Sequence, residues 1–190
     1  IDPSNGDWRR ELAVAHRLAG RGFMRLGRED EAEQEIQAGG RILEALLSDD
    51  PAQQRWRIEL VNLETVHADL AERRGDRAAS IAFLEAARGR LEEVAAASNA
   101  QVLSAVHQVR WSALMVAEGR LLEESGAADA ALRSWLSALD RLPAEDALPA
   151  PRRLAQALVQ LEALLRMGRL SEAEAIVAEL DGAGIGEQSL

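Results

Sequence analysis

Histidine is the side chain of this sequence best suited to acid–base or metal chemistry near neutral pH. His16, His67 and His107 lie far apart along the chain, and none has a second ligand at a metal-binding spacing. His67 falls on the inner face of a predicted helix, which favours a place in the core. The sequence contains no cysteine, which excludes thiolate metal sites, disulfides and cysteine catalysis. We therefore expect no metal site, no cofactor and no catalysis by histidine.

Two further motifs resemble catalytic or phosphate-binding patterns but lack the context that such chemistry needs. A dinucleotide-binding glycine loop follows a strand and opens a helix, whereas a predicted helix precedes the glycine-rich residues 182–186 and only four residues follow them. Adjacent glutamates occur at 92–93 and 123–124, and neighbours on a helix point about 100° apart rather than toward one substrate. The sequence favours a protein that is not an enzyme.

Arginines give the strongest candidate for a binding surface. Arg17, Arg21 and Arg25 are spaced four residues apart and form one stripe on the first predicted helix. Guanidinium groups suit bidentate binding of carboxylates, while like charges at this spacing repel by roughly 0.2–0.5 kcal/mol per pair. Two interpretations follow. Either acidic residues of the adjacent helix, such as Asp69 and Glu72, neutralise the stripe, or the stripe binds an acidic or carboxylate-terminated partner.

Composition bears on the class of partner. The 190 residues carry a net charge of −10, all 22 basic residues are arginines, and no long basic block occurs, so nucleic acid is not an expected partner. No apolar run approaches the roughly 18 residues of a membrane span, so we expect no membrane partner. No signal peptide is visible, so we expect a cytoplasmic protein. Because the chain starts at Ile1 rather than at methionine, we expect it to be a fragment of a longer protein.

The elements that position these side chains are predicted to be helices. Leucine and alanine are abundant, whereas aromatic residues make up only 3% of the chain, which favours helix over sheet. Apolar residues recur at helical spacing on both sides of four glycines. A glycine just past a helix end adopts the left-handed conformation at little cost, so each of the four is predicted to form a hairpin turn. These glycines are Gly27, Gly75, Gly126 and Gly168. The predicted helix pairs are 7–26 with 30–47, 52–73 with 77–97, 100–124 with 128–141, and 152–166 with 171–181.

Two more glycines lie inside the first predicted helix, where each costs about 1 kcal/mol relative to alanine. Gly20 and Gly22 precede the turn at Gly27 and do not form it. Because glycine has no side chain, we predict that both let two helices approach closely.

The chain also repeats itself. Residues 2–12 and 50–60 match at six positions with an offset of 48 residues, and the match includes Trp8 with Trp56. Equivalent tryptophans in two repeats favour packing between hairpins over ligand binding. Stacked hairpins bury a core that they share, so an array cut before helix 7–26 would expose an apolar end there.

These residues resemble the tetratricopeptide repeat, whose unit is a helical hairpin with small residues at fixed places, typically about 34 residues long. In the first unit, Gly20, Phe23, Gly27, Ala32 and Pro51 match the family's pattern. Later units match at Ala68 and Ser80, at Gly119, Ala131 and Trp135, and at Gly168 and Ala173. The turn glycines lie 48, 51 and 42 residues apart, which is similar to the long-helix variants of the family. The resemblance implies an all-α fold, a right-handed α-α superhelix of about four antiparallel hairpins. It also implies a single array over 1–190, with units of about 1–50, 51–98, 99–142 and 151–182.

The resemblance implies a function as well. First-helix positions of this kind line a concave groove in the family, and here they would be Arg17, Arg21, Arg25, Asn62, Asp69, Arg73, Arg120, Glu123, Glu162 and Arg166. We expect a non-catalytic protein–protein interaction scaffold that binds a protein or peptide segment in this groove, one that is acidic or ends in a carboxylate. The alternative is a structural spacer or a self-associating module, for which a homodimer is one form. Residues 2–16 are similar to the start of arrays that follow kinase or winged-helix modules in large bacterial signalling proteins.

Overall fold

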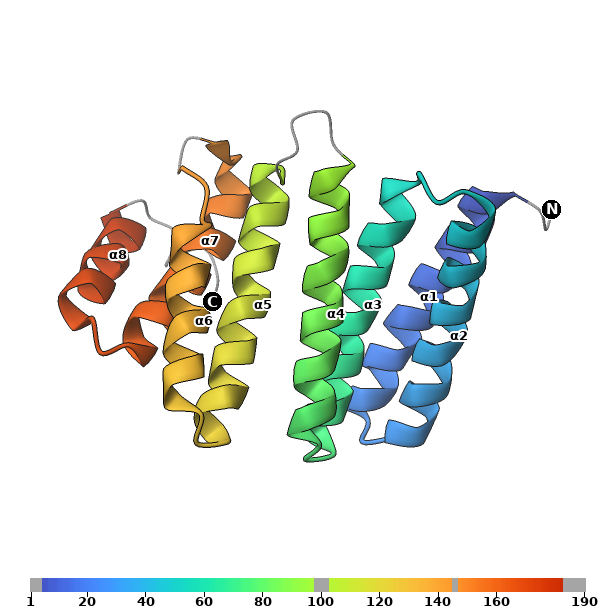
Figure 1. Ribbon diagram of the computed structural model, residues 1–190, viewed down its shortest axis with the longest axis horizontal. Coiled ribbons are helices and arrows are strands. Elements are labelled where there is room, and N and C mark those ends of the chain that lie inside the picture. Colours follow the sequence, from blue (N-terminus) through green and yellow to red (C-terminus); the bar gives the residue numbers. More distant parts are fainter. Residues whose placement is uncertain (1–4, 98–102, 145–146, 183–190) are drawn as a thin grey trace. The chain divides into compact units, whose positions relative to one another are not determined.

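The computed structural model describes residues 5–97, 103–144 and 147–182, and over these ranges the protein is all-α (Figure 1). Eight helices and no strand occur in the described ranges. The helices are α1 (Gly6–Arg25), α2 (Glu29–Asp49), α3 (Gln54–Arg73), α4 (Arg77–Ala96), α5 (Ala105–Glu124), α6 (Ala128–Asp140), α7 (Ala150–Arg166) and α8 (Leu170–Gly182). The chain divides into two compact units, Ile1–Leu103 and Ser104–Leu190, which hold four helices each.

The four predicted helix pairs are confirmed. All helix ends but one lie within two residues of the predicted ends. The exception is α5, which begins at Ala105 rather than at residue 100, after an extended backbone at Ser104 (φ −62°, ψ 155°). Within each pair the two helices pack against each other.

The predicted hairpin turns are confirmed at the level of the backbone. Gly27, Gly75, Gly126 and Gly168 have φ values of 70°, 76°, 86° and 69°, in the left-handed region that glycine tolerates best. At the first turn, the Gly27 N–H donates to the Met24 carbonyl (3.1 Å), and the Arg28 N–H donates to the Phe23 carbonyl (2.9 Å). This pair of bonds is the Schellman motif, which satisfies two carbonyls at the end of a helix.

Each unit is built by one hairpin stacking on another. In the first unit, α3 contacts both α1 and α2 in addition to its own partner α4. In the second unit, α7 contacts both α5 and α6 in addition to its own partner α8. The core of the first unit is shared between its hairpins, because Ile36 and Leu43 of α2 pack in one cluster with Leu60 and Leu63 of α3. A superhelix that runs through all four hairpins stays a prediction, as does a single array over 1–190.

The close approach predicted at Gly20 is confirmed, whereas the one predicted at Gly22 is wrong. A Cβ atom added at Gly20 would lie 2.8 Å from Cγ1 of Ile36 and 3.3 Å from the carbonyl oxygen of Ala32, so α2 packs directly on the Gly20 backbone. A Cβ atom added at Gly22 would meet no atom within 4 Å. The two residues lie about 200° apart around the helix, so only one of them can face α2.

This difference predicts opposite effects of the same substitution on one helix. Gly22→Ala is expected to raise the free energy of unfolding by about 0.5–1 kcal/mol, because it improves helix propensity without a clash. Gly20→Ala is expected to lower the free energy of unfolding by about 1 kcal/mol or more, because overpacking against Ile36 outweighs the gain in propensity. Urea titrations at low protein concentration measure both changes, and a stabilising Gly20→Ala would contradict the packing described.

Candidate functional site

The first of the predicted arginines is held by a carboxylate that lies between α1 and α3. Arg17 is half-buried, and its Nη2 lies 3.7 Å from Oε2 of Glu59. The Nη1 atom of Arg10 lies 3.6 Å from Oε1 of the same carboxylate, and the amide of Asn62 donates to Oε2 at 3.0 Å. Burial lowers the pKa of Arg17, Glu59 raises it and Arg21 lowers it further. Arg17 and Asn62, both predicted for the groove, therefore belong to an ion-pair cluster that joins two helices.

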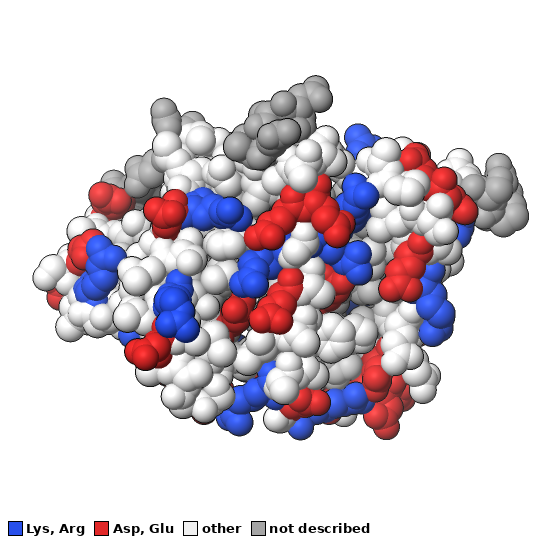
Figure 2. All heavy atoms as spheres, in the orientation of Figure 1, with Lys and Arg blue, Asp and Glu red and all other residues white. Residues whose placement is uncertain are grey.

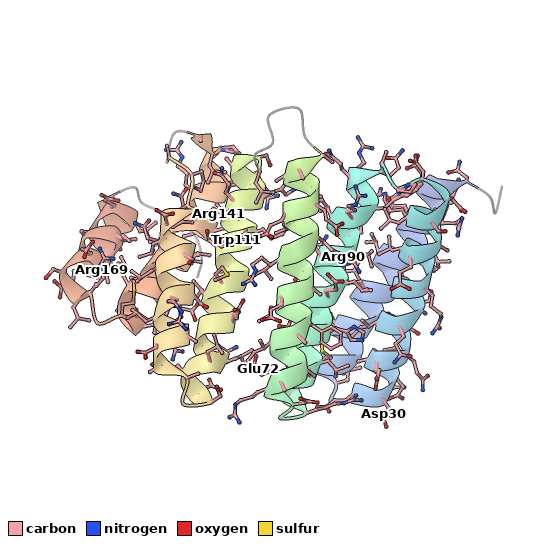
Figure 3. All side chains as sticks on the ribbon, in the orientation of Figure 1. Asp30, Glu72, Arg90, Trp111, Arg141 and Arg169 are labelled. Carbon is pink, nitrogen blue, oxygen red and sulfur yellow. The ribbon has the colours of Figure 1, made fainter. Side chains whose placement is uncertain are left out.

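The other two predicted arginines line a hollow between the C-terminal halves of α1 and α3. The hollow has a volume of about 510 Å³, and its lining is Arg21, Met24, Arg25, Asp69, Glu72 and Arg73. Three guanidinium groups and two carboxylates face this space. Glu72 lies in the last turn of α3, close to the end of the hairpin (Figure 3). The structure thus brings together four of the predicted groove residues, namely Arg21, Arg25, Asp69 and Arg73.

Within the hollow, the side chains differ in how fully their charges are satisfied. Nη1 of Arg73 donates to the carbonyl oxygen of Met24 at 3.3 Å, where a cation is favoured by the negative end of α1. Asp69 and Glu72 have interaction partners of their own. Arg21 and Arg25 are exposed, and among the described residues neither forms a hydrogen bond or an ion pair within 4.0 Å. Asp69 and Glu72 therefore lie in the same hollow as Arg21 and Arg25 but form no ion pair with them.

Ion pairs are common on the surface of the first unit. Figure 2 shows acidic and basic atoms interspersed over the visible face of the first unit. Arg28 donates to Glu31 in α2 at 2.6 Å, and Arg74 contacts Glu33 at 2.6 Å and Asp30 at 3.0 Å. Arg74 lowers the pKa of Glu33 through the hydrogen bond it donates. Arg21 and Arg25 form no such pair among the described residues, and the same holds for the exposed Arg41 and Arg55. What distinguishes Arg21 and Arg25 is that both line one hollow.

Two of the four groove residues predicted in the second unit pair with each other, and a third pairs with a neighbouring glutamate. Nη1 of Arg166 lies 3.0 Å from Oε2 of Glu123, which joins α7 to α5. Nη1 of Arg120 lies 3.2 Å from Oε1 of Glu124, one turn further along α5. Glu162 is exposed on α7. These contacts satisfy most of the predicted charges of this unit internally, and the continuous groove that the resemblance implies through both units stays a prediction.

The side chains first considered for catalysis or metal binding lie apart in the structure. Nδ1 of His16 lies 2.6 Å from Oε2 of Glu35. The ring of His67 stacks on Phe83 with centroids 4.4 Å apart, and burial lowers the pKa of His67. The residue is half-buried, whereas the sequence predicted a place in the core. Burial also lowers the pKa of His107. Within the described ranges, no group of three or more histidine or acidic side chains could hold a metal ion.

Two other sequence features have simple structural readings. Residues 183–186 of the glycine-rich motif lie outside the described residues, while α8 extends to Gly182. Glu92 and Glu93 are both exposed on α4, and Glu93 pairs with Nε of Arg57 at 3.4 Å.

In the part of the chain that the structure describes, no helix is long and apolar enough to cross a bilayer.

Sequence reasoning missed two residues of this surface. Glu59 holds Arg10, Arg17 and Asn62, although the internal repeat had already marked it as the counterpart of Glu11. Met24 forms an apolar part of the hollow, and no sequence pattern distinguished it from other core residues.

Comparison with known proteins adds nothing to this geometry, since no protein-family model matches the chain and no curated protein matches it significantly.

Proposed function

We propose that the protein is a non-catalytic interaction module, and that the hollow between α1 and α3 binds an acidic or carboxylate-terminated segment of a protein partner. The observation that carries this proposal is the state of Arg21 and Arg25, which are exposed, line the hollow and form no ion pair among the described residues. Their spacing of one helical turn lets both guanidiniums reach one extended segment. The resemblance to the tetratricopeptide repeat supports the same surface, because that family binds partner segments in a groove lined by first-helix side chains.

The chemistry of the hollow favours a carboxylate over other anions of similar charge. Guanidinium groups bind a planar carboxylate through two parallel hydrogen bonds. Asp69 and Glu72 at the same hollow repel an anion that is large or highly charged. Met24 offers an apolar contact for the residue next to the bound carboxylate. We therefore expect selectivity for a peptide that presents one carboxylate at a time over a polyanion such as nucleic acid.

Binding of a model peptide tests this proposal. The probe is a fluorescein-labelled octapeptide of glycine and serine that ends in a single glutamate with a free carboxyl terminus, and its anisotropy is followed against protein concentration. The double variant Arg21→Gln, Arg25→Gln is expected to weaken binding at least tenfold, because each lost charge-assisted hydrogen bond contributes about 1.5–3 kcal/mol. Binding is also expected to weaken as salt is raised.

A matched control separates a specific site from general attraction to arginines. The double variant Arg28→Gln, Arg169→Gln removes the same charge, but both side chains are already held by Glu31 and Glu172 at 2.6 Å. This control is expected to bind the peptide as the wild type does. Equal affinities for all three proteins would contradict the proposal, provided that circular dichroism shows the same helix content in each.

A further inference from the structure

One face of α1 is apolar and has no partner within its unit. Trp8, Leu12 and Leu26 lie on one stripe of the helix, at spacings of four and fourteen residues, and are 58%, 52% and 70% exposed. Leu18 borders this stripe and is 56% exposed. The face is distinct from the side of α1 that packs on α2, which Gly20 marks. The apolar end that the sequence predicts on helix 7–26 is therefore present.

The internal repeat shows what such a face packs against. An offset of 48 residues carries Trp8, Leu12 and Leu18 onto Trp56, Leu60 and Val66 of α3. Leu60 and Val66 are buried, and all three counterparts pack in the core cluster that α3 shares with the preceding hairpin. The exposed face of α1 is therefore equivalent to the face of α3 that packs on the preceding hairpin.

The other half of such an interface is exposed at α7 and α8. There an apolar hollow of about 430 Å³ is lined by Leu161, Leu165, Leu170, Ala173, Glu174, Val177, Ala178 and Asp181. Three of these side chains are large, apolar and about half exposed: Leu165 (51%), Leu170 (59%) and Val177 (43%). An apolar hollow with two exposed leucines suits a helix rather than water.

The repeat indicates that this hollow corresponds to the face of a hairpin on which the first helix of the next hairpin packs. When Gly168 is aligned with Gly27, the sequence of α7–α8 matches that of α1–α2 with an offset of 141 residues. The structure supports the alignment, because Arg28 pairs with Glu31 at 2.6 Å and the aligned Arg169 pairs with Glu172 at 2.6 Å. Leu165 and Val177 then correspond to Met24 and Ile36. Those two residues are buried in the cluster that receives α3.

The two exposed halves differ from the internal interface in a matched way. Inside the first unit, Nε of Arg74 lies 3.6 Å from Oε2 of Glu29. The counterparts of this ion pair on the two exposed faces are two leucines, Leu26 and Leu170. A charged pair has been replaced by an apolar pair, so that each half still fits the other.

Side-chain size is exchanged in the same way. Inside the first unit, Leu63 packs on Gly39 and Gly40, where an added Cβ atom would lie 3.1 Å and 3.3 Å from its methyl groups. In α1 the counterpart of Leu63 is Ala15, and in α8 the counterparts of the two glycines are Leu180 and Asp181. Inside the unit a large leucine packs on two glycines, whereas the two exposed faces carry a small alanine on one side and two larger side chains on the other.

We propose that a second copy of this chain is the occupant of both faces, with α1 of one copy packed on α7 and α8 of the next. The charge and size exchanges favour this occupant, because one chain carries both halves of the altered interface. The contact is heterologous, so association is head-to-tail and each copy offers a further free face. This differs from a two-fold dimer, in which the face of α1 would pack on itself.

Complementary variants test the proposal by sedimentation velocity over a range of concentrations. Leu26→Arg and Leu170→Glu each place a charge against a leucine of the partner copy, so each protein alone is expected to stay monomeric. Both positions are exposed at helix ends, where these charges suit the helix dipole, so folding is not disturbed. The wild type is expected to form species larger than a dimer as its concentration rises.

Mixing the two variants gives the decisive result. In the mixture, α1 of Leu26→Arg meets α8 of Leu170→Glu and restores the kind of ion pair seen between Arg74 and Glu29. The remaining faces, α8 of Leu26→Arg with Leu170 and α1 of Leu170→Glu with Leu26, are unaltered and fit each other. The mixture is therefore expected to form species larger than a dimer, as the wild type does. A monomeric wild type, a mixture that stays monomeric, or a Leu170→Glu protein that still associates would each overturn the proposal. The last result would indicate contact between two α1 helices instead.

Discussion

Leu60→Ala is expected to lower the free energy of unfolding by about 2–5 kcal/mol, whereas Leu12→Ala is expected to change it by less than about 0.5 kcal/mol. The two leucines occupy the same place in the internal repeat. Leu60 is 3% exposed in the core that α3 shares with the first hairpin, and Leu12 is 52% exposed on α1. The first substitution removes buried methyl groups and leaves a cavity, while the second removes groups that water already contacts.

Urea denaturation of the two variants beside the wild type measures this difference. The titrations are made at a concentration at which all three proteins are monomeric, so that the face of α1 stays free. Similar losses of stability from both substitutions would show that the α1 face is covered within the chain. That outcome would contradict both the structure of the first unit and the exposed half-interface inferred from it.

Arg90→Met is expected to lower the free energy of unfolding by about 2–3 kcal/mol at pH 7. Glu64 of α3 is 8% exposed, and Nε of Arg90 in α4 donates to its Oε1 at 2.5 Å (Arg90 is labelled in Figure 3). Within the described residues, Oε2 of Glu64 has no hydrogen-bond partner. Removal of Arg90 would leave a buried carboxylate with no compensating charge, which is among the more costly changes in a protein interior.

The loss of stability in Arg90→Met is expected to shrink on acidification. Burial raises the pKa of Glu64 above its ordinary value, and the hydrogen bond from Arg90 opposes that shift. A carboxyl group with a raised pKa in the folded state contributes stability that is fully present below its unfolded pKa and is lost as pH rises through its folded pKa. Without Arg90 the folded pKa rises further, so the difference from the wild type should decrease between pH 7 and pH 4.

The matched control replaces the carboxylate as well. The double variant Glu64→Gln, Arg90→Met has no buried charge, so it should recover most of the stability lost in the single variant. Its difference from the wild type should also vary less with pH. A single variant whose deficit is small and independent of pH would show that Glu64 is hydrated in the folded protein.

The hairpins could be predicted from the sequence because their signals are local. Gly27 and Gly75 end helices whose apolar spacing is visible on both sides, and the left-handed backbone at both turns follows from glycine alone. The contacts of Gly20 and Gly22, by contrast, could not be predicted from local signals. Both look alike in the sequence, but only Gly20 faces α2, and the direction of each residue depends on how the two helices pack.

The candidate site was predictable in its types of residue and less so in their partners. The spacing of Arg21 and Arg25 placed both on one stripe, and in the structure they line one hollow. The carboxylate that holds Arg17 was missed, since Glu59 lies 42 positions further along the chain and meets Arg17 only when α3 packs on α1. Long-range ion pairs of this kind depend on the register between helices, which the pattern of one helix does not contain.

The most direct test of the proposed function observes the arginine side chains themselves. In a ¹⁵N-labelled protein, the Nε–Hε signals of Arg21, Arg25 and Arg73 are assigned by substitution, and the octapeptide that ends in a single glutamate is added. We predict that these three signals shift in a saturable manner, while those of Arg28 and Arg169, which Glu31 and Glu172 hold at 2.6 Å, stay in place. Unchanged signals from the three hollow arginines, or equal shifts of all five, would contradict a carboxylate-binding site between α1 and α3.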